Sequence, residues 1–136
     1  MKIKNLLLLP LIGTFLGGCG YYRSSYHATL LITSNTATEA SIDFGTFDGQ
    51  YVFDLRRSDP EDGRIECDAS LKEGTVKVLY YDVFLDVEAE LFVIGGGQSV
   101  KESYGYVEPD RKYVIIVKSL GEAVDGRFSF NINGKI

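Results

Sequence analysis

Short runs of alternating apolar and polar residues, separated by turn signals, are the feature that most constrains the fold of this chain. In the last run, Phe128, Phe130 and Ile132 alternate with polar residues. Successive side chains of a β-strand point to opposite faces, so a run with period two buries one face and exposes the other. No run after residue 26 has the 3.6-residue apolar period of a capped helix. The sequence therefore predicts an all-β fold, a single antiparallel β-sandwich, jelly-roll-like, with eight or nine strands.

Turn signals place the ends of these strands. The strongest turn is "SDPEDG" at residues 58–63, which combines Asp-Pro with Asp-Gly. Residues 40–44 and 50–55 have a hairpin-like spacing across "GTFDG". Residues 112–118 are apolar on both faces, which predicts a central strand, and the more polar residues 99–107 predict an edge strand. The remaining strands are expected at residues 27–33, 64–69, 74–84, 87–94 and 126–132.

The first 18 residues have the three parts of a secretory signal peptide. A basic start precedes the apolar run of residues 6–16, and two glycines follow that run. A transmembrane helix needs about 20 apolar residues. This run is shorter and is interrupted by Pro10. We therefore expect residues 1–18 to be a signal peptide and not a permanent membrane span.

Cys19 follows this leader directly. The stretch Leu16-Gly17-Gly18-Cys19 resembles the lipobox of bacterial lipoprotein signal peptides, in which an aliphatic residue and two small residues precede the cysteine. The resemblance implies cleavage before Cys19, a diacylglyceryl group on its thiol, and a mature chain held at a bacterial cell membrane by lipid. Residues 19–26 are then the lipidated tether and residues 27–136 the β-sandwich domain. The alternative is an ordinary secretory leader with an incidental cysteine.

Cys67 is the only other cysteine, so lipid on Cys19 leaves it without a disulfide partner. Within residues 64–69, Ile65, Cys67 and Ala69 share one face of the expected strand. Free cysteine is among the most buried residue types. We therefore expect Cys67 to be a buried structural thiol. A nucleophilic role needs a nearby histidine, and His27 is the only one in the chain.

The net charge argues against a nucleic-acid partner. It is −5 for the whole chain and becomes −7 if Lys2 and Lys4 leave with the leader. An acidic domain repels phosphate backbones and anionic lipid headgroups. We therefore expect no nucleic acid as partner, and attachment to the membrane through the N-terminal lipid alone.

The residue sets for catalysis and for zinc are also missing from the sequence. No Gly-x-Ser-x-Gly elbow occurs, and one histidine with one cysteine cannot complete a zinc site. Calcium needs only oxygen ligands, but the acidic residues do not follow the spacing of a calcium loop. We expect no enzyme, no cofactor and no metal. The weak calcium candidates are Asp59, Asp62, Asp82 and Asp86.

Exposed aromatic rings are the candidates for binding. Tyr81, Tyr104 and Tyr106 fall where exposure is expected, and Tyr104 and Tyr106 share a face across Gly105. Aromatic rings on a sheet surface stack on sugars or anchor protein partners. Packing in the core or at an edge is the alternative interpretation, because β-sheets are rich in tyrosine.

The order of pieces in residues 71–132 resembles that of bacterial pre-peptidase C-terminal domains and related jelly rolls. The matching pieces are Gly74-Thr75-Val76, the Gly-rich turn at residues 95–97, the strand at residues 113–117 and Gly126-Arg127-Phe128. This resemblance implies a non-catalytic, exported β-sandwich.

Three functional hypotheses follow from these patterns. The first is a lipid-anchored lipoprotein of the cell envelope, with a non-catalytic module that binds an envelope protein or has a structural role. The second is a small glycan-binding accessory domain that uses its exposed tyrosines, with or without calcium. The third, an envelope hydrolase, lacks a set of nucleophile, base and orienting residue.

Overall fold

The computed structural model describes residues 22–135, so Cys19 and the predicted leader lie outside it. The described residues form nine strands, all paired antiparallel, which confirms the predicted all-β antiparallel fold. None of them forms a helix long and apolar enough to cross a membrane. The strands are β1 (Ser25–Thr29), β2 (Ile32–Asn35), β3 (Glu39–Arg56), β4 (Gly63–Glu73), β5 (Thr75–Asp82), β6 (Val87–Gly95), β7 (Gln98–Val107), β8 (Lys112–Ser119) and β9 (Ala123–Lys135).

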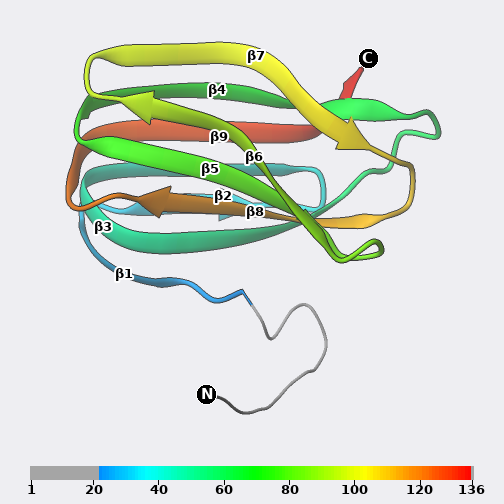
Figure 1. The fold of residues 1–136 in the computed structure, drawn as a ribbon, viewed down its shortest axis with the longest axis horizontal. Coiled ribbons are helices and arrows are strands. Elements are labelled where there is room, and N and C mark those ends of the chain that lie inside the picture. Colours follow the sequence, from blue (N-terminus) through cyan, green and yellow to red (C-terminus); the bar gives the residue numbers. More distant parts are fainter. Residues whose placement is uncertain (1–21, 136) are drawn as a thin grey trace, which may run out of the picture.

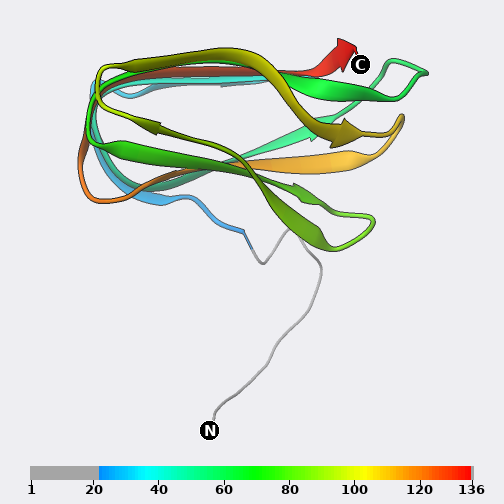
Figure 2. The same ribbon diagram turned by 45° about the horizontal axis from the view of Figure 1, so that its top comes forward.

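The strands belong to one continuous sheet that folds over into two layers (Figures 1 and 2). Their order is β6-β5-β8-β3-β9-β4-β7, and β1 and β2 pair along the other edge of β3. The first layer contains β2, the N-terminal half of β3, β9, β4 and β7. The second layer contains the C-terminal half of β3, β8, β5 and β6, with β1 along the edge. Contacts between β6 and β7 close one side of the sandwich.

β3 connects the two layers. Its residues 39–47 pair with β9, and its residues 50–56 pair with β8. Gly49 lies at the crossing with a φ of +137°, and its backbone passes so close to Ser25 and Tyr26 of β1 that a side chain has no room. The hairpin predicted across residues 45–49 is therefore wrong. The two halves do not pair with each other; β3 is one continuous strand that bends from the first layer into the second (Figure 1). Phe47 in the bend is buried and is paired on both sides, with Ala28 and Ala123.

The N-terminal boundary also differs from the prediction. The single strand expected at residues 27–33 is two strands, separated at Leu30, which has a φ of 52°. β1 begins at Ser25, inside the residues expected to form the tether. The positions of β7 at an edge and of β8 between β3 and β5 are confirmed.

The main core lies between the layers and is built from the inward residues of the alternating runs. Phe128, Phe130 and Ile132 are buried as predicted, and so are Ile65 and Cys67. Burial raises the pKa of the Cys67 thiol to about 12. At neutral pH this thiol is therefore protonated, and it is a packing residue and not a nucleophile.

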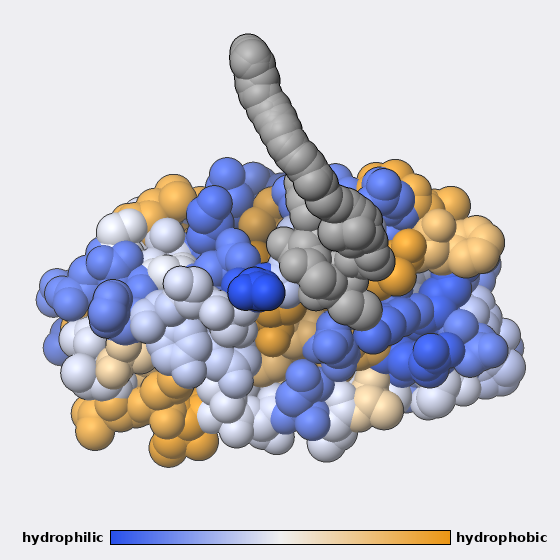
Figure 3. Space-filling model, turned by 90° about the horizontal axis from the view of Figure 1, so that it is seen from below, coloured by the Kyte–Doolittle hydropathy of each residue, from blue (hydrophilic) through white to orange (hydrophobic). Residues whose placement is uncertain are grey.

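The second layer also has apolar residues on its outer face. Val114 and Ile116 of β8 form a separate buried cluster with Tyr81 of β5, and Tyr22 packs against this cluster. The ring centroids of Tyr22 and Tyr81 are 4.8 Å apart, and the Tyr22 hydroxyl donates a hydrogen bond to Glu88 on β6. The chain thus enters the domain across this face. Figure 3 shows the same side, with apolar surface at its right-hand end, where Figure 1 has the β5–β6 turn.

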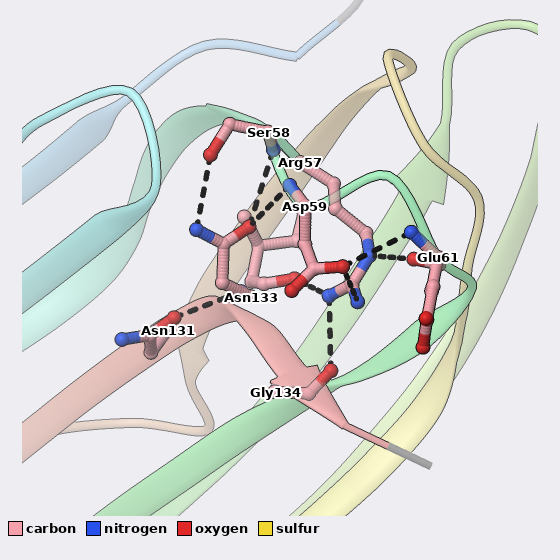
Figure 4. A network of polar contacts seen from close by, with 8 residues as sticks. Arg57, Ser58, Asp59, Glu61, Asn131, Asn133 and Gly134 are labelled. Atoms are coloured by element: carbon pink, nitrogen blue, oxygen red, sulfur yellow. Dashed lines mark hydrogen bonds and ion pairs between the residues drawn. The ribbon is translucent and has the colours of Figure 1, made fainter.

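A buried arginine ties the β3–β4 loop to the end of β9 (Figure 4). The Arg57 side chain is fully buried, and its Nη2 lies 3.5 Å from Oδ1 of Asp59. Its Nε donates to the carbonyl oxygen of Glu61 at 2.6 Å. Its Nη1 donates to the carbonyl oxygens of Ile132 at 2.8 Å and Gly134 at 2.9 Å. Buried charge is tolerated only when it is paired and hydrogen-bonded. Here Nε and Nη1 are hydrogen-bonded, and Nη2 is paired through its ion contact with Asp59 alone.

Candidate functional site

Tyr81, one of the three tyrosines predicted to bind, is not available at the surface. Only 5% of it is exposed, and its hydroxyl donates a hydrogen bond to Asp86. The expected exposure is wrong because Tyr22 covers this part of β5. The period-two pattern placed Tyr81 correctly on the outer face of its strand, but it could not reveal that a preceding segment covers that face.

Tyr104 and Tyr106 do not share a face. Gly63 of β4 is paired with Val107 of β7, and Ile65 of β4 is paired with Tyr104 of β7. Two residues of β7 but only one residue of β4 lie between these pairs, so a β-bulge breaks the alternation of β7. The Tyr104 ring packs against Phe92, with centroids 5.4 Å apart.

Tyr106 is the exposed member of this pair, at 49%. Its hydroxyl donates to a carboxylate oxygen of Asp62 at 2.5 Å, and this hydrogen bond raises the pKa of Tyr106. The two rings therefore do not form the paired stacking platform that the sequence predicted.

The four calcium candidates lie in two separate turns. Asp59 is paired with Arg57, and Asp62 accepts the hydrogen bond of Tyr106. Asp82 lies 3.5 Å from Arg111 and accepts two backbone hydrogen bonds within its own turn. Asp86 accepts the hydrogen bond of Tyr81. Among residues 22–135, no group of three or more acidic, histidine or cysteine side chains is arranged to hold a metal ion.

Polar residues instead form a ladder across the outer face of the first layer. One row runs over five adjacent strands, where cross-strand pairing joins Ser34, Ser41, Ser129, Asp68 and Lys101 in that order. Neighbouring strands lie about 4.8 Å apart, so this row spans about 19 Å. A second row runs beside it and joins Glu39, Asn131, Glu66 and Ser103. We call these two rows the ladder face.

The ladder face is hollowed. A cavity of about 470 Å³ lies over it, and every residue of both rows lines this cavity. Three carboxylates of the two rows line it against a single ammonium group: Glu39, Glu66 and Asp68 against Lys101. The only aromatic residue in the lining is Phe130, which is 2% exposed because its ring belongs to the core. The site therefore offers hydrogen-bond acceptors and donors, with negative charge in excess and no ring to stack on.

The outward residues of single strands could be predicted from the sequence, but this site could not. The outward positions of Ser129 and Asn131 follow from period two, and so do those of Glu66 and Asp68. The pattern cannot show that β9 lies between β3 and β4, which is what assembles these residues into rows. The available signal was the shared polar character of the outward positions in these runs, where small hydroxyls, carboxylates and amides are joined by one lysine, Lys101.

No known family model matches this chain, and no curated protein matches it in sequence. Among solved structures, it is similar to family 29 carbohydrate binding modules. A CBM29-2 mutant complexed with mannohexaose has a TM-score of 0.43 and 16% identity, over 84% of this chain and 95% of that chain. Another structure of a family 29 module has a TM-score of 0.41 and 17% identity, over 84% of this chain and 92% of that chain.

Proposed function

We propose that this protein is an exported, lipid-anchored binding module that holds a neutral glycan on its ladder face. The single observation that carries the binding role is the hollow over two rows of hydrogen-bonding side chains. A glycan presents many hydroxyl groups, and each can donate and accept. The hydroxyls of Ser41, Ser103 and Ser129 also do both, the carboxylates accept, and Lys101 and Asn131 donate. An extended row of such groups matches a chain of hydroxyls along its length.

The charge of the hollow selects among glycans. Three carboxylates against one ammonium group make it negative. Uronate and sulfate groups of an acidic glycan would be repelled there, because like charges brought together cost free energy. A neutral sugar chain has no such penalty. Recognition by hydrogen bonds replaces the tyrosine stacking expected from the sequence.

The side chains around the hollow also favour a binding role over a catalytic one. Cys67 lies beneath it, but burial raises the pKa of this thiol to about 12, so the thiolate is scarce at neutral pH. The only histidine, His27, lies on β1, which contributes no residue to the lining. The residues described around the hollow therefore favour a binding role.

The glycan proposal is tested by affinity electrophoresis of the purified protein through gels that contain galactomannan, mixed-linkage glucan or polygalacturonate. We expect at least one neutral polysaccharide to retard the protein and polygalacturonate to leave it unretarded. Asp68→Ala is expected to weaken retardation about tenfold, since a hydrogen bond to a charged group contributes about 1.5–3 kcal/mol.

Asp54→Ala is the matched control for Asp68→Ala. Asp54 is an exposed aspartate on the part of β3 that pairs with β8, so the variant removes the same charge from the other layer. It should leave retardation unchanged. Equal weakening by Asp54→Ala, or retardation by polygalacturonate alone, contradicts the proposed site.

The lipid anchor is the second part of the proposal, and it rests on the lipobox-like stretch that ends at Cys19. Two or more acyl chains give stable attachment, because each buried CH₂ contributes about 0.8 kcal/mol. Cys19→Ala is therefore expected to move the protein from the membrane fraction of a bacterial host to the soluble exported fraction. Cys67→Ala, which alters the only other cysteine, should stay with the membrane. Retention of Cys19→Ala in the membrane fraction overturns the anchor.

A further inference from the structure

The β5–β6 turn displays apolar side chains to solvent. Phe84 is 72% exposed and Leu85 55% exposed, and Val87 at the start of β6 is 53% exposed. Large apolar side chains gathered on one turn of a small domain commonly mark a contact surface.

The turn is held in one shape by its own polar groups. Oδ1 of Asp82 accepts the backbone N–H of Phe84 at 2.9 Å and that of Leu85 at 3.1 Å. Asp86, with a φ of 57°, donates its backbone N–H to the Asp82 carbonyl oxygen. The guanidinium of Arg111 lies 4.2 Å from the centroid of the Phe84 ring and covers one side of it. The apolar side chains are thus presented by an ordered turn, which lowers the entropic cost of a contact.

The acidic groups beside the turn are occupied by partners within the protein. Asp82 is paired with Arg111, which also lies 3.1 Å from Glu108. Asp86 accepts the hydrogen bond of Tyr81, and Glu88 accepts that of Tyr22. Asp86 and Glu88 are exposed, but each carboxylate accepts the hydrogen bond of a tyrosine hydroxyl, and the two residues at the tip, Phe84 and Leu85, are apolar.

The anchor point of the chain is close to this turn. Tyr22 contacts Tyr81 and Glu88, on the two strands that the turn connects. Cys19 precedes Tyr22 by three residues, which span at most about 11 Å even when fully extended. Tyr81 likewise precedes Phe84 by three residues. Figure 2 shows the start of the described chain and the β5–β6 turn on the same, lower side of the molecule.

We infer that the β5–β6 turn inserts Phe84 and Leu85 into the headgroup and acyl boundary of the bilayer that holds Cys19. This inference rests on the lipid anchor proposed above. A lipid on Cys19 brings the bilayer within reach of the turn, and the carboxylates beside the apolar tip are already bonded within the protein. Apolar side chains of this kind insert roughly 5–10 Å into the membrane interface, and by themselves they bind the membrane weakly. Held next to an acyl anchor, they fix which side of the domain faces the membrane.

A single tryptophan tests this orientation, since the chain contains none. The full lipidated protein carrying Phe84→Trp is reconstituted into phosphatidylcholine vesicles with or without brominated acyl chains. We expect the brominated lipid to remove about half or more of its emission, because the ring lies at the acyl boundary. Tyr106→Trp is the matched aromatic control on β7, which lies on the opposite, upper side in Figures 1 and 2. Its emission should instead be quenched by aqueous iodide.

Flotation of the same vesicles separates the two ways in which the inference can fail. Protein that does not float with the vesicles overturns the anchor, and the membrane-facing turn with it. If the protein floats but its Phe84→Trp emission is quenched by iodide and unchanged by brominated lipid, as expected for Tyr106→Trp, the proposed orientation is wrong. The lipid anchor is then still supported. Leu85→Trp provides a second position on the same turn and is expected to behave like Phe84→Trp.

Discussion

Arg57→Met is expected to lower the free energy of unfolding by about 3–5 kcal/mol, which is the usual cost of removing one member of a buried ion pair. The replacement leaves Asp59 without its cation, and it leaves the carbonyl oxygens of Glu61, Ile132 and Gly134 without the donors that now reach them. Each buried acceptor left unsatisfied costs about 1–3 kcal/mol. Methionine fills much of the volume but donates no hydrogen bond, so packing does not offset this loss.

Urea unfolding followed by tyrosine fluorescence measures this effect, and Arg56→Met is its control. Arg56 is the neighbouring arginine, but its side chain is 55% exposed and its ion pair with Asp110, at 3.2 Å, is exposed as well. Exposed pairs contribute about 0–1 kcal/mol, so this variant should unfold close to the wild type. If the slope of the unfolding free energy against urea concentration is the same in variant and wild type, the shift in the unfolding midpoint measures a change in stability. Similar midpoints for the two variants would contradict the buried network of Figure 4.

The parts of the fold that depend on local alternation could be predicted from the sequence. Phe128, Phe130 and Ile132 point inward because period two is a property of a single strand. The central position of β8 followed from a run that is apolar on both faces, and Val114 and Ile116 are buried on the side away from the main core. Both inferences need only the residues of one strand.

The parts that depend on distant segments could not be predicted. "GTFDG" has the composition of a turn, yet β3 runs through it because β1, which precedes it, and β9, which comes much later, pair along both of its edges. Tyr81 is hidden by Tyr22, almost 60 residues earlier in the chain. The ladder face required the order β3-β9-β4-β7, which local patterns do not contain.

The proposed functions use opposite sides of the sandwich. The hollow lies over the first layer, whereas Tyr22 enters the domain across the outer face of the second layer. Figures 1 and 2 show β4 and β7 of the first layer on the upper side and the start of the described chain on the lower side. A domain with its lower side against a membrane would therefore present the ladder face away from the bilayer, where a glycan can approach it.

Phe47→Ala is expected to lower the free energy of unfolding by about 3–5 kcal/mol, as for other buried phenylalanines replaced by alanine. Phe47 is fully buried where β3 crosses between the layers, and its ring lies 5.2 Å from that of Phe44 and 5.7 Å from that of Tyr26. Alanine leaves a cavity at the corner of the sandwich. The surrounding strands are paired on both sides of β3 and cannot collapse into this cavity.

Phe84→Ala is the matched control, because it removes the same atoms from a ring that is 72% exposed. In detergent solution, it should change the free energy of unfolding by less than about 1 kcal/mol, because an exposed contact between an aromatic ring and an arginine contributes no more than that to stability. Urea midpoints of the two variants also distinguish the two interpretations of residues 45–49. In a hairpin, Phe47 would lie at an exposed tip, and its replacement would cost as little as that of Phe84. A large loss for Phe47→Ala alone requires the ring to be in the core, and therefore requires β3 to continue through the segment as one strand.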